Sequence, residues 1–185
     1  MRTRVGYCGG AKQSPTYHDL GDHTETFQVD YDPKKISYDK LLEVFWKEHV
    51  PTDAPWSVQY KAVVFAATDE QERLATASRD ALEKKLGKKV TTEIRRKWTF
   101  WLAEDYHQKY LLQNRPEIAR ELRKIYPRTK DLVDSTAAAR INGWLAGHGD
   151  PLVFEKEVGD CGLSKEARAL LRKRMGQAES KSCGE

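Results

Sequence analysis

The sequence has no long apolar segment. No run of about 18 apolar residues occurs among its 185 residues, and a membrane-spanning helix needs a run of roughly that length. The first residues carry charge but no apolar stretch of the kind found in secretory signal peptides. We therefore expect no membrane partner and a cytoplasmic protein.

Cysteine is scarce as well. The three cysteines, Cys8, Cys161 and Cys183, cannot all pair within one chain. They form no Cys-x-x-Cys pair, and His18 and His23 match no ligand spacing of a known metal site, so we expect no metal. A disulfide scaffold is unusual in a chain of this size without a secretion signal. The remaining explanations for the three cysteines are buried thiols or redox chemistry.

No large excess of one charge is present. Lys and Arg number 32 and Asp and Glu number 28, which gives a net charge of +4. The basic clusters are Lys84-Lys85, Lys88-Lys89 and Arg95-Arg96-Lys97. Such clusters can bind nucleic acid, but no nucleic-acid motif accompanies them. The pattern favours a solvated helix face and the turn that follows it, so we expect no nucleic-acid partner.

The apolar pattern predicts alternating strands and helices. Phe27, Val29 and Tyr31 alternate with polar residues, which indicates a strand over 24–31 with one buried face. We predict further strands at 60–67 and 90–96, and helices at 37–49, 68–87, 103–112, 116–126, 136–145 and after Ser164. Ser37 and Thr68 are the expected caps of the first two helices. This order predicts an α/β or α+β fold with a helical C-terminal extension.

Three polar side chains are candidates for a catalytic role. Glu25 shares its strand parity with Phe27, so it points toward the apolar side, where loss of water favours the protonated acid. Such an acid can protonate a reacting oxygen; the other interpretation is a strand-end glutamate in solvent. Tyr17 and Tyr60 can donate hydrogen bonds to the same oxygen, or they are amphipathic residues at the edge of the core.

The two distal cysteines are candidates for thiol exchange. Cys183 lies in a polar segment at the C-terminus, where a thiol can reach another site, or it is an inert exposed cysteine. Cys161 precedes the predicted helix after Ser164, where the helix dipole favours a thiolate. Cys8 lies between glycines and is most simply a small buried side chain.

The candidate residues belong to a longer pattern. The segments are Arg4-Val5-Gly6-Tyr7 with Gly9-Gly10, Pro15-Thr16-Tyr17, Gly21-Asp22-His23-Thr24-Glu25, Gln59-Tyr60 and 103–111. Their order and spacing resemble those of the peptide-methionine (S)-S-oxide reductase family over residues 2 to about 115. Residues 134–149 resemble a helical extension that some eukaryotic members carry.

This resemblance implies a fold, an activity and a set of partners. The fold would be α+β, a two-layer α/β arrangement with a ferredoxin-like sheet. The activity would be thiol-dependent reduction of peptide or protein-bound methionine (S)-sulfoxide, a repair of oxidative damage. Glu25 would be the acid, and Tyr17 and Tyr60 would hold the sulfoxide oxygen. Thioredoxin or dithiothreitol would be the reductant, oxidised proteins or free methionine sulfoxide the substrate, with no bound cofactor and a monomeric protein.

The resemblance also implies a resolving cysteine and a departure from the family. We expect Cys183 rather than Cys161 to resolve the oxidised nucleophile, because residues 176–185 contain almost nothing to bury. The family's Gly-Cys-Phe-Trp-Gly block stands upstream of the segment that here begins at Met1. The nucleophile, the first strand and the first helix are therefore expected to be missing, and Pro55-Trp56-Ser57 displaces an acidic residue that usually precedes the Gln-Tyr pair.

Two functional hypotheses follow from the resemblance and the departure. The first is an enzyme of methionine repair that is active in a full-length form. The second is a non-catalytic, reductase-like module that binds an oxidised peptide. The predicted domains are an N-terminally incomplete reductase-like domain at 1–127, a helical extension at 128–175 and a flexible tail at 176–185.

Overall fold

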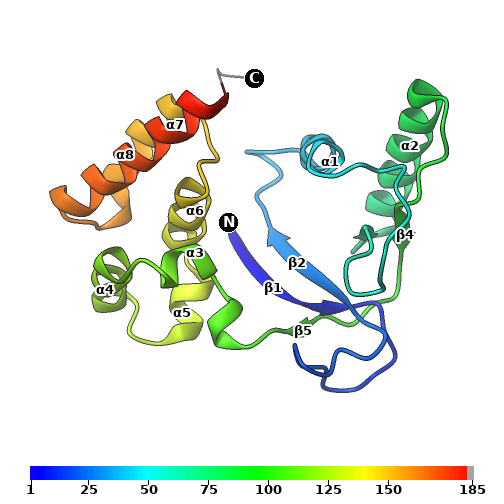
Figure 1. Ribbon diagram of the computed structural model, residues 1–185, viewed down its shortest axis with the longest axis horizontal. Helices are drawn as coiled ribbons and strands as arrows, with labels where there is room; N and C mark the ends of the chain where they lie inside the picture. The colour runs from blue at the N-terminus through cyan, green and yellow to red at the C-terminus, as the bar shows by residue number, and fades with distance from the viewer. Residues whose placement is uncertain (183–185) are drawn as a thin grey trace. The chain divides into compact units, whose positions relative to one another are not determined.

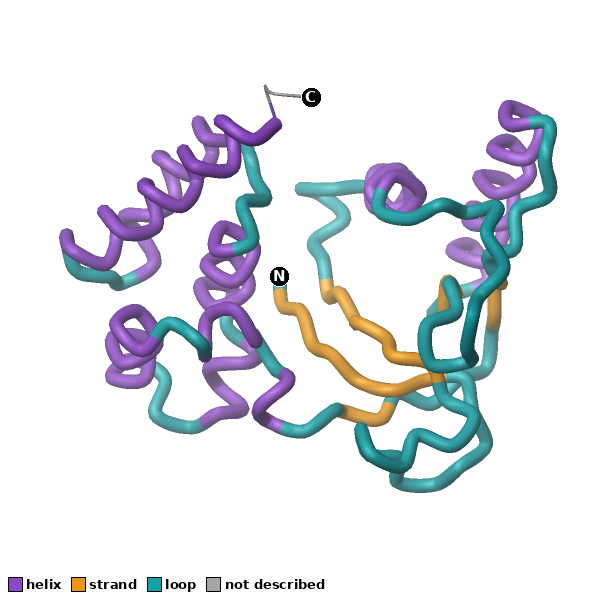
Figure 2. The backbone as a smooth tube through the Cα atoms, viewed as in Figure 1, coloured by secondary structure: helices purple, strands orange, loops and turns teal. Residues whose placement is uncertain are grey.

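The computed structural model describes the backbone of residues 1–182 and the side chains of residues 1–176. Its strands all precede Ala103, and residues 104–182 form helices joined by loops and turns (Figures 1 and 2). The contacts divide the chain into two compact units. The first contains Met1–Arg4, Gln28–Asp30 and the chain from Glu104, and the second contains Val5–Phe27 and Tyr31–Ala103. The content of helices and a small sheet confirms the α+β class.

The strands form two small sheets. Strand β1 (Arg2–Cys8) lies between β2 (Thr24–Asp30) and β5 (Trp101–Leu102). Strands β1 and β5 run antiparallel, with Tyr7 opposite Trp101. Strand β3 (Val63–Phe65) pairs in parallel with β4 (Glu93–Arg95). The structure confirms the predicted β2, β3 and β4 within a few residues. The sequence prediction missed β1, in a glycine-rich segment that was assigned to a loop, and β5, because a two-residue strand shows no periodicity.

Two capped helices belong to the second unit. Helix α1 (Tyr38–Lys47) begins where the Ser37 hydroxyl accepts a hydrogen bond from the N–H of Lys40. Helix α2 (Asp69–Leu86) begins at Thr68, whose hydroxyl accepts from the N–H of Gln71, and the Gln71 side chain accepts from the N–H of Ala67. Both caps were predicted, and both are confirmed, because a cap depends on residues three positions apart.

The first unit is built mainly from short helices. They are η1 (Asp105–His107), α3 (Tyr110–Gln113), α4 (Pro116–Ile125), α5 (Thr129–Asp134), α6 (Thr136–Leu145), α7 (Pro151–Glu157), η2 (Val158–Cys161) and α8 (Lys165–Ser182). Helix α8 packs against α6 (Figure 1). The core of this unit consists of fully buried side chains from several helices: Leu112, Ile118, Leu122, Leu132, Ile141 and Leu171.

The predicted helix over 103–112 is wrong. The segment splits into η1 and α3, because Lys109 between them adopts a left-handed backbone conformation with φ of 50°. A helix cannot run through such a residue. The conformation accompanies a long-range contact: the buried Lys109 ammonium donates hydrogen bonds to the carbonyl and hydroxyl of Thr3.

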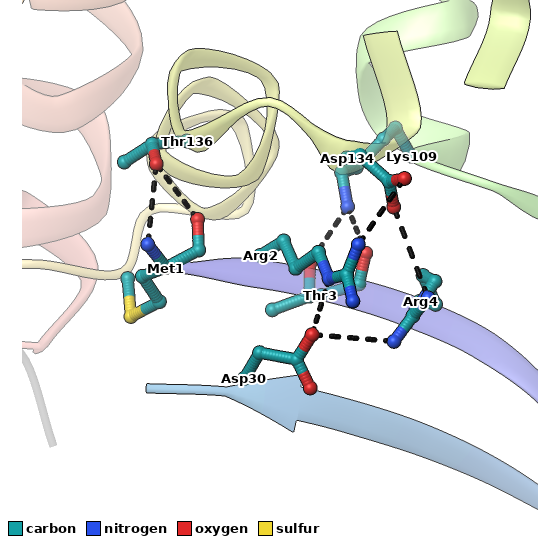
Figure 3. A network of polar contacts seen from close by, with 8 residues as sticks. All are labelled: Met1, Arg2, Thr3, Arg4, Asp30, Lys109, Asp134 and Thr136. Carbon is teal, nitrogen blue, oxygen red and sulfur yellow. Dashed lines mark hydrogen bonds and ion pairs between the residues drawn. The ribbon is translucent and has the colours of Figure 1, made fainter. Parts of the chain in front are cut away.

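A polar network surrounds Lys109 inside the first unit (Figure 3). The guanidinium of Arg4 lies 3.2 Å from a carboxylate oxygen of Asp30 and 4.0 Å from one of Asp134. Arg2 also pairs with both acids. Alternating charges of this kind compensate one another, so the start of β1 is held to the helical unit by polar contacts as well as by packing.

Two predictions from the sequence, the absence of a membrane partner and the division into three domains, stay predictions. No helix within residues 1–182 is long and apolar enough to cross a membrane. Helix α8 continues through Ser182, inside the segment predicted as a flexible tail. The compact units follow packing, whereas the predicted domain boundaries at 127 and 175 follow the family resemblance, so those boundaries stay predictions.

Candidate active site

The loop between β1 and β2 is held closed by two side chains at its end. The Asp22 carboxylate accepts hydrogen bonds from the N–H groups of Ala11 and Lys12 at 2.9 and 3.2 Å. These N–H groups lower the pKa of Asp22, because they stabilise the ionised form. Buried His23 accepts from the N–H of Gly10 through Nδ1 and lies 2.8 Å from the Lys12 carbonyl through Nε2. One neutral tautomer, with its proton on Nε2, satisfies both contacts.

Gly10 is required at the point where the loop closes. A Cβ atom there would lie 2.4 Å from the Asp22 carboxylate and 2.7 Å from the backbone nitrogen of His23. Because the second neighbour is backbone, the loop would have to open to admit a side chain. Gly10 therefore allows the two ends of the loop to approach each other.

Tyr17 lies in a tight turn within this loop. Thr16 and Asp19 exchange backbone hydrogen bonds across it at 3.3 and 3.1 Å. The Tyr17 ring contacts the ring of His18 edge-on at 5.4 Å, and its side chain is 40% exposed. The turn thus presents the tyrosine at the surface of the second unit.

Glu25 is joined to a segment far away in the sequence. Its N–H donates to the carbonyl of Gln59 at 3.0 Å, and the Gln59 amide donates to Glu25 Oε1 at 2.7 Å. One residue earlier on each segment, the Thr24 hydroxyl donates to the carbonyl of Val58 at 2.9 Å. The start of β2 and the residues before Tyr60 therefore run side by side.

The expectation that Glu25 faces a covered apolar side is wrong. Glu25 is exposed, and Phe27, on the same face of β2, is 64% exposed. The alternation was correct, but this face is open to solvent. The structure agrees with the other interpretation, a strand-end glutamate in solvent.

Tyr60 stacks on a neighbouring aromatic residue. Its ring lies 4.7 Å from that of Trp56 at an interplanar angle of 25°, and the two side chains are 45% and 81% exposed. Sequence reasoning missed this stack and the bond between Gln59 and Glu25. A signal for the stack was available, since two aromatic residues four apart after Pro55 can meet in a turn. No local signal predicts the Gln59–Glu25 pairing.

The two cysteines among the described residues are buried. Burial raises the pKa of the Cys8 thiol to about 11, although Arg95 opposes the shift. Burial also raises the pKa of Cys161, whose thiol donates to the carbonyl of Glu157 at 3.6 Å. The expected help from a helix dipole is therefore outweighed at Cys161, which lies in η2 of the first unit. Cys183 lies outside the described residues.

The acidic and imidazole groups of the loop have structural partners. Asp19 pairs with Lys12 at 2.6 Å, while Asp22 and His23 bind the backbone. Within the residues that the structure describes, no group of three or more His, Cys, Asp or Glu side chains is placed to hold a metal ion. Asp19, Asp22 and His23 thus stabilise the closed form of the loop.

Comparison with known proteins identifies the family to which the chain belongs. The sequence profile of peptide methionine sulfoxide reductases matches residues 1–140. A peptide methionine sulfoxide reductase of Drosophila melanogaster is 40% identical over 170 residues, which cover 91% of this chain and 68% of the fly protein. Peptide methionine sulfoxide reductase A5 of Oryza sativa is 38% identical over 152 residues, 79% of this chain and 59% of the rice protein.

Solved structures agree with the sequence matches. Reduced Mxr1 from Saccharomyces cerevisiae superposes with a TM-score of 0.55 at 30% identity, over 62% of this chain and 71% of the yeast chain. Methionine sulfoxide reductase A of Corynebacterium diphtheriae superposes with a TM-score of 0.52 at 28% identity, over 60% of this chain and 63% of the bacterial chain. The chain belongs to the peptide methionine sulfoxide reductase family, a family of oxidoreductases that reduce methionine sulfoxide.

Proposed function

We propose that this protein reduces the S-diastereomer of methionine sulfoxide in peptides and proteins. The observation that carries the proposal is the pairing of Glu25 with the Gln59–Tyr60 segment at the surface of one compact unit. Family membership supports it, as does the position of Tyr17 in the loop that leads into β2. In the balanced reaction, one sulfoxide and two thiols give one methionine, one disulfide and one water.

The chemistry of the side chains suggests their roles. The sulfoxide oxygen carries partial negative charge, and the hydroxyl groups of Tyr17 and Tyr60 donate hydrogen bonds to it. Glu25 supplies a proton to this oxygen as the sulfur is reduced. Because Glu25 Oε1 accepts from the Gln59 amide, the proton that is transferred resides on Oε2.

The thiol steps require groups other than the two buried cysteines. With their pKa values raised by burial, Cys8 and Cys161 stay protonated near neutral pH, and a thiol is a poor nucleophile. In a full-length form, the cysteine of the family's Gly-Cys-Phe-Trp-Gly block would attack the sulfoxide sulfur and form the disulfide with a second cysteine. We propose Cys183 as that resolving residue, thioredoxin as the reductant that reopens the disulfide, and a monomer without a bound cofactor. A cytoplasmic location stays a proposal as well.

One observation favours a second candidate function. Neither thiol in the described part of the chain is an accessible thiolate. A module with the same oxygen-binding groups could bind an oxidised peptide without reducing it. This second function shares the substrate of the first and differs only in turnover.

Turnover and binding measured on the same protein separate the two functions. A full-length form that carries the family's Gly-Cys-Phe-Trp-Gly block is incubated with dithiothreitol and with the S- or R-sulfoxide of N-acetylmethionine, and methionine formation is followed. The first function predicts turnover of the S-form and a loss of about 10²-fold in Glu25→Gln, the usual contribution of a general acid. Glu48→Gln, at an exposed glutamate that follows α1, is the matched control. Binding without turnover supports the second function, and an unchanged rate in Glu25→Gln removes this residue from the mechanism.

A further inference from the structure

Trp56 is the most unusual exposed side chain in the second unit. It is 81% exposed, whereas a large aromatic side chain is usually buried or covered by a partner. Val58, in the same loop, is also exposed. An exposed tryptophan beside polar groups is typical of a recognition site rather than of a folding core.

The loop that carries Trp56 is held in place at both ends. At its start, the Thr91 N–H donates to the carbonyl of Pro51 at 2.8 Å, and the Thr91 hydroxyl donates to that of Asp53 at 2.6 Å. At its end, Val58 and Gln59 bind the start of β2. The exposure of Trp56 is therefore a property of an anchored loop.

The anchored loop places Trp56 beside the proposed oxygen-binding groups. Its indole stacks on the ring of Tyr60, and the residue before Tyr60 bonds to Glu25. A substrate whose sulfoxide oxygen lies at Tyr60 and Glu25 brings the residues next to its methionine sulfoxide toward the indole. A flat apolar surface of this kind attracts aromatic and aliphatic side chains and offers little to glycine.

We propose that Trp56 is a specificity-determining residue that selects peptides in which an apolar side chain flanks the methionine sulfoxide. The inference rests on the proposed function, because it places the sulfoxide at Glu25 and Tyr60. It names the substrate class as apolar peptide segments, which are exposed when a protein is damaged or unfolded. Free methionine sulfoxide has no flanking side chain, so it gains nothing from the indole.

The test compares binding of two blocked tripeptides by calorimetric titration without a reductant. In one peptide the methionine S-sulfoxide stands between two phenylalanines, and in the other it stands between two glycines. We expect the parent protein to bind the phenylalanine peptide more tightly. Trp56→Ala should weaken binding of the phenylalanine peptide by about tenfold, the scale of one aromatic contact together with its buried area. The affinity for the glycine peptide should change by less than about twofold. Trp56→Phe should retain most of the preference.

Leu152→Ala removes a comparably exposed apolar side chain from the first unit and should change neither affinity. The inference is overturned if the parent binds the two peptides equally or not at all, or if Trp56→Ala weakens both to the same extent. Because binding is measured without turnover, these outcomes are independent of the assay for the proposed function. Reduction of free S-sulfoxide without a Trp56-dependent peptide preference would support the proposed function and refute this inference.

Discussion

The buried Lys109 predicts an unusual dependence of stability on pH. Its side chain is 5% exposed, and burial lowers its pKa from the ordinary value of 10.5 to about 8. The carboxylate of Asp134 favours the charged form, and the guanidinium of Arg4 disfavours it, but burial is the largest cause. The hydrogen bonds to Thr3 hold the ammonium in this environment.

The sign of the effect follows from which state binds the proton. Between pH 8 and 10.5 the unfolded chain keeps the Lys109 proton, whereas the folded chain releases it. Stability rises with pH wherever the unfolded state binds more protons. The stabilising contribution of Lys109 to the free energy of unfolding is therefore complete above pH 10.5 and is lost as the pH falls through about 8. The two pKa values differ by 2.5, and 1.36 kcal/mol for each pH unit gives a contribution of about 3 kcal/mol.

Other groups titrate in the same range with the opposite sign. Burial raises the pKa of Cys8 from 9.0 to about 11 and that of Tyr38 from 10.0 to about 12. Folded protein keeps these two protons longer, so their contributions fall as the pH rises. The effect of Lys109 must therefore be measured as the difference in free energy of unfolding between the parent and Lys109→Met. Methionine keeps a long side chain without the charge.

Urea unfolding of both proteins, followed by circular dichroism from pH 8 to 10.5, measures this difference. As the pH rises across this range, the free energy of unfolding of the parent should increase by about 2 to 3 kcal/mol relative to that of Lys109→Met. Lys84→Met, at an exposed position of α2, should show no such change against the parent. A difference between the parent and Lys109→Met that does not vary with pH would refute the account of the buried ammonium.

Two further predictions concern the second unit's loop and the buried thiols. Gly10→Ala should destabilise the protein by about 1–3 kcal/mol in the same assay, because its Cβ would overlap the backbone of His23. Gly143→Ala, within α6 and with open space around it, should not destabilise the protein. Equal effects of the two substitutions would contradict the close approach at Gly10. In labelling with Ellman's reagent at neutral pH, Cys8→Ser and Cys161→Ser should each leave the fast phase of the folded protein unchanged and remove one thiol only from the unfolded count; loss of the fast phase in either variant would show that this thiol is accessible.

The sequence by itself determined the features that depend on near neighbours. The caps at Ser37 and Thr68 were predicted because a cap joins residues three positions apart. The strand over 24–31 was predicted because its side chains alternate, and β2 covers Thr24–Asp30. The motif residues around Tyr17, Glu25 and Tyr60 indicated the family, which the comparisons confirmed.

Only the tertiary structure decided which faces are covered and which distant segments meet. Alternation places Glu25 and Phe27 on one face of β2, but whether that face is buried depends on what packs against it, and here it is open. The bonds between Glu25 and Gln59 join segments far apart in the sequence. Lys109 looked like a helical residue, yet its contact with Thr3 fixes it in a left-handed conformation. Local propensities are small energies, and long-range contacts of a buried charge or a paired segment can outweigh them.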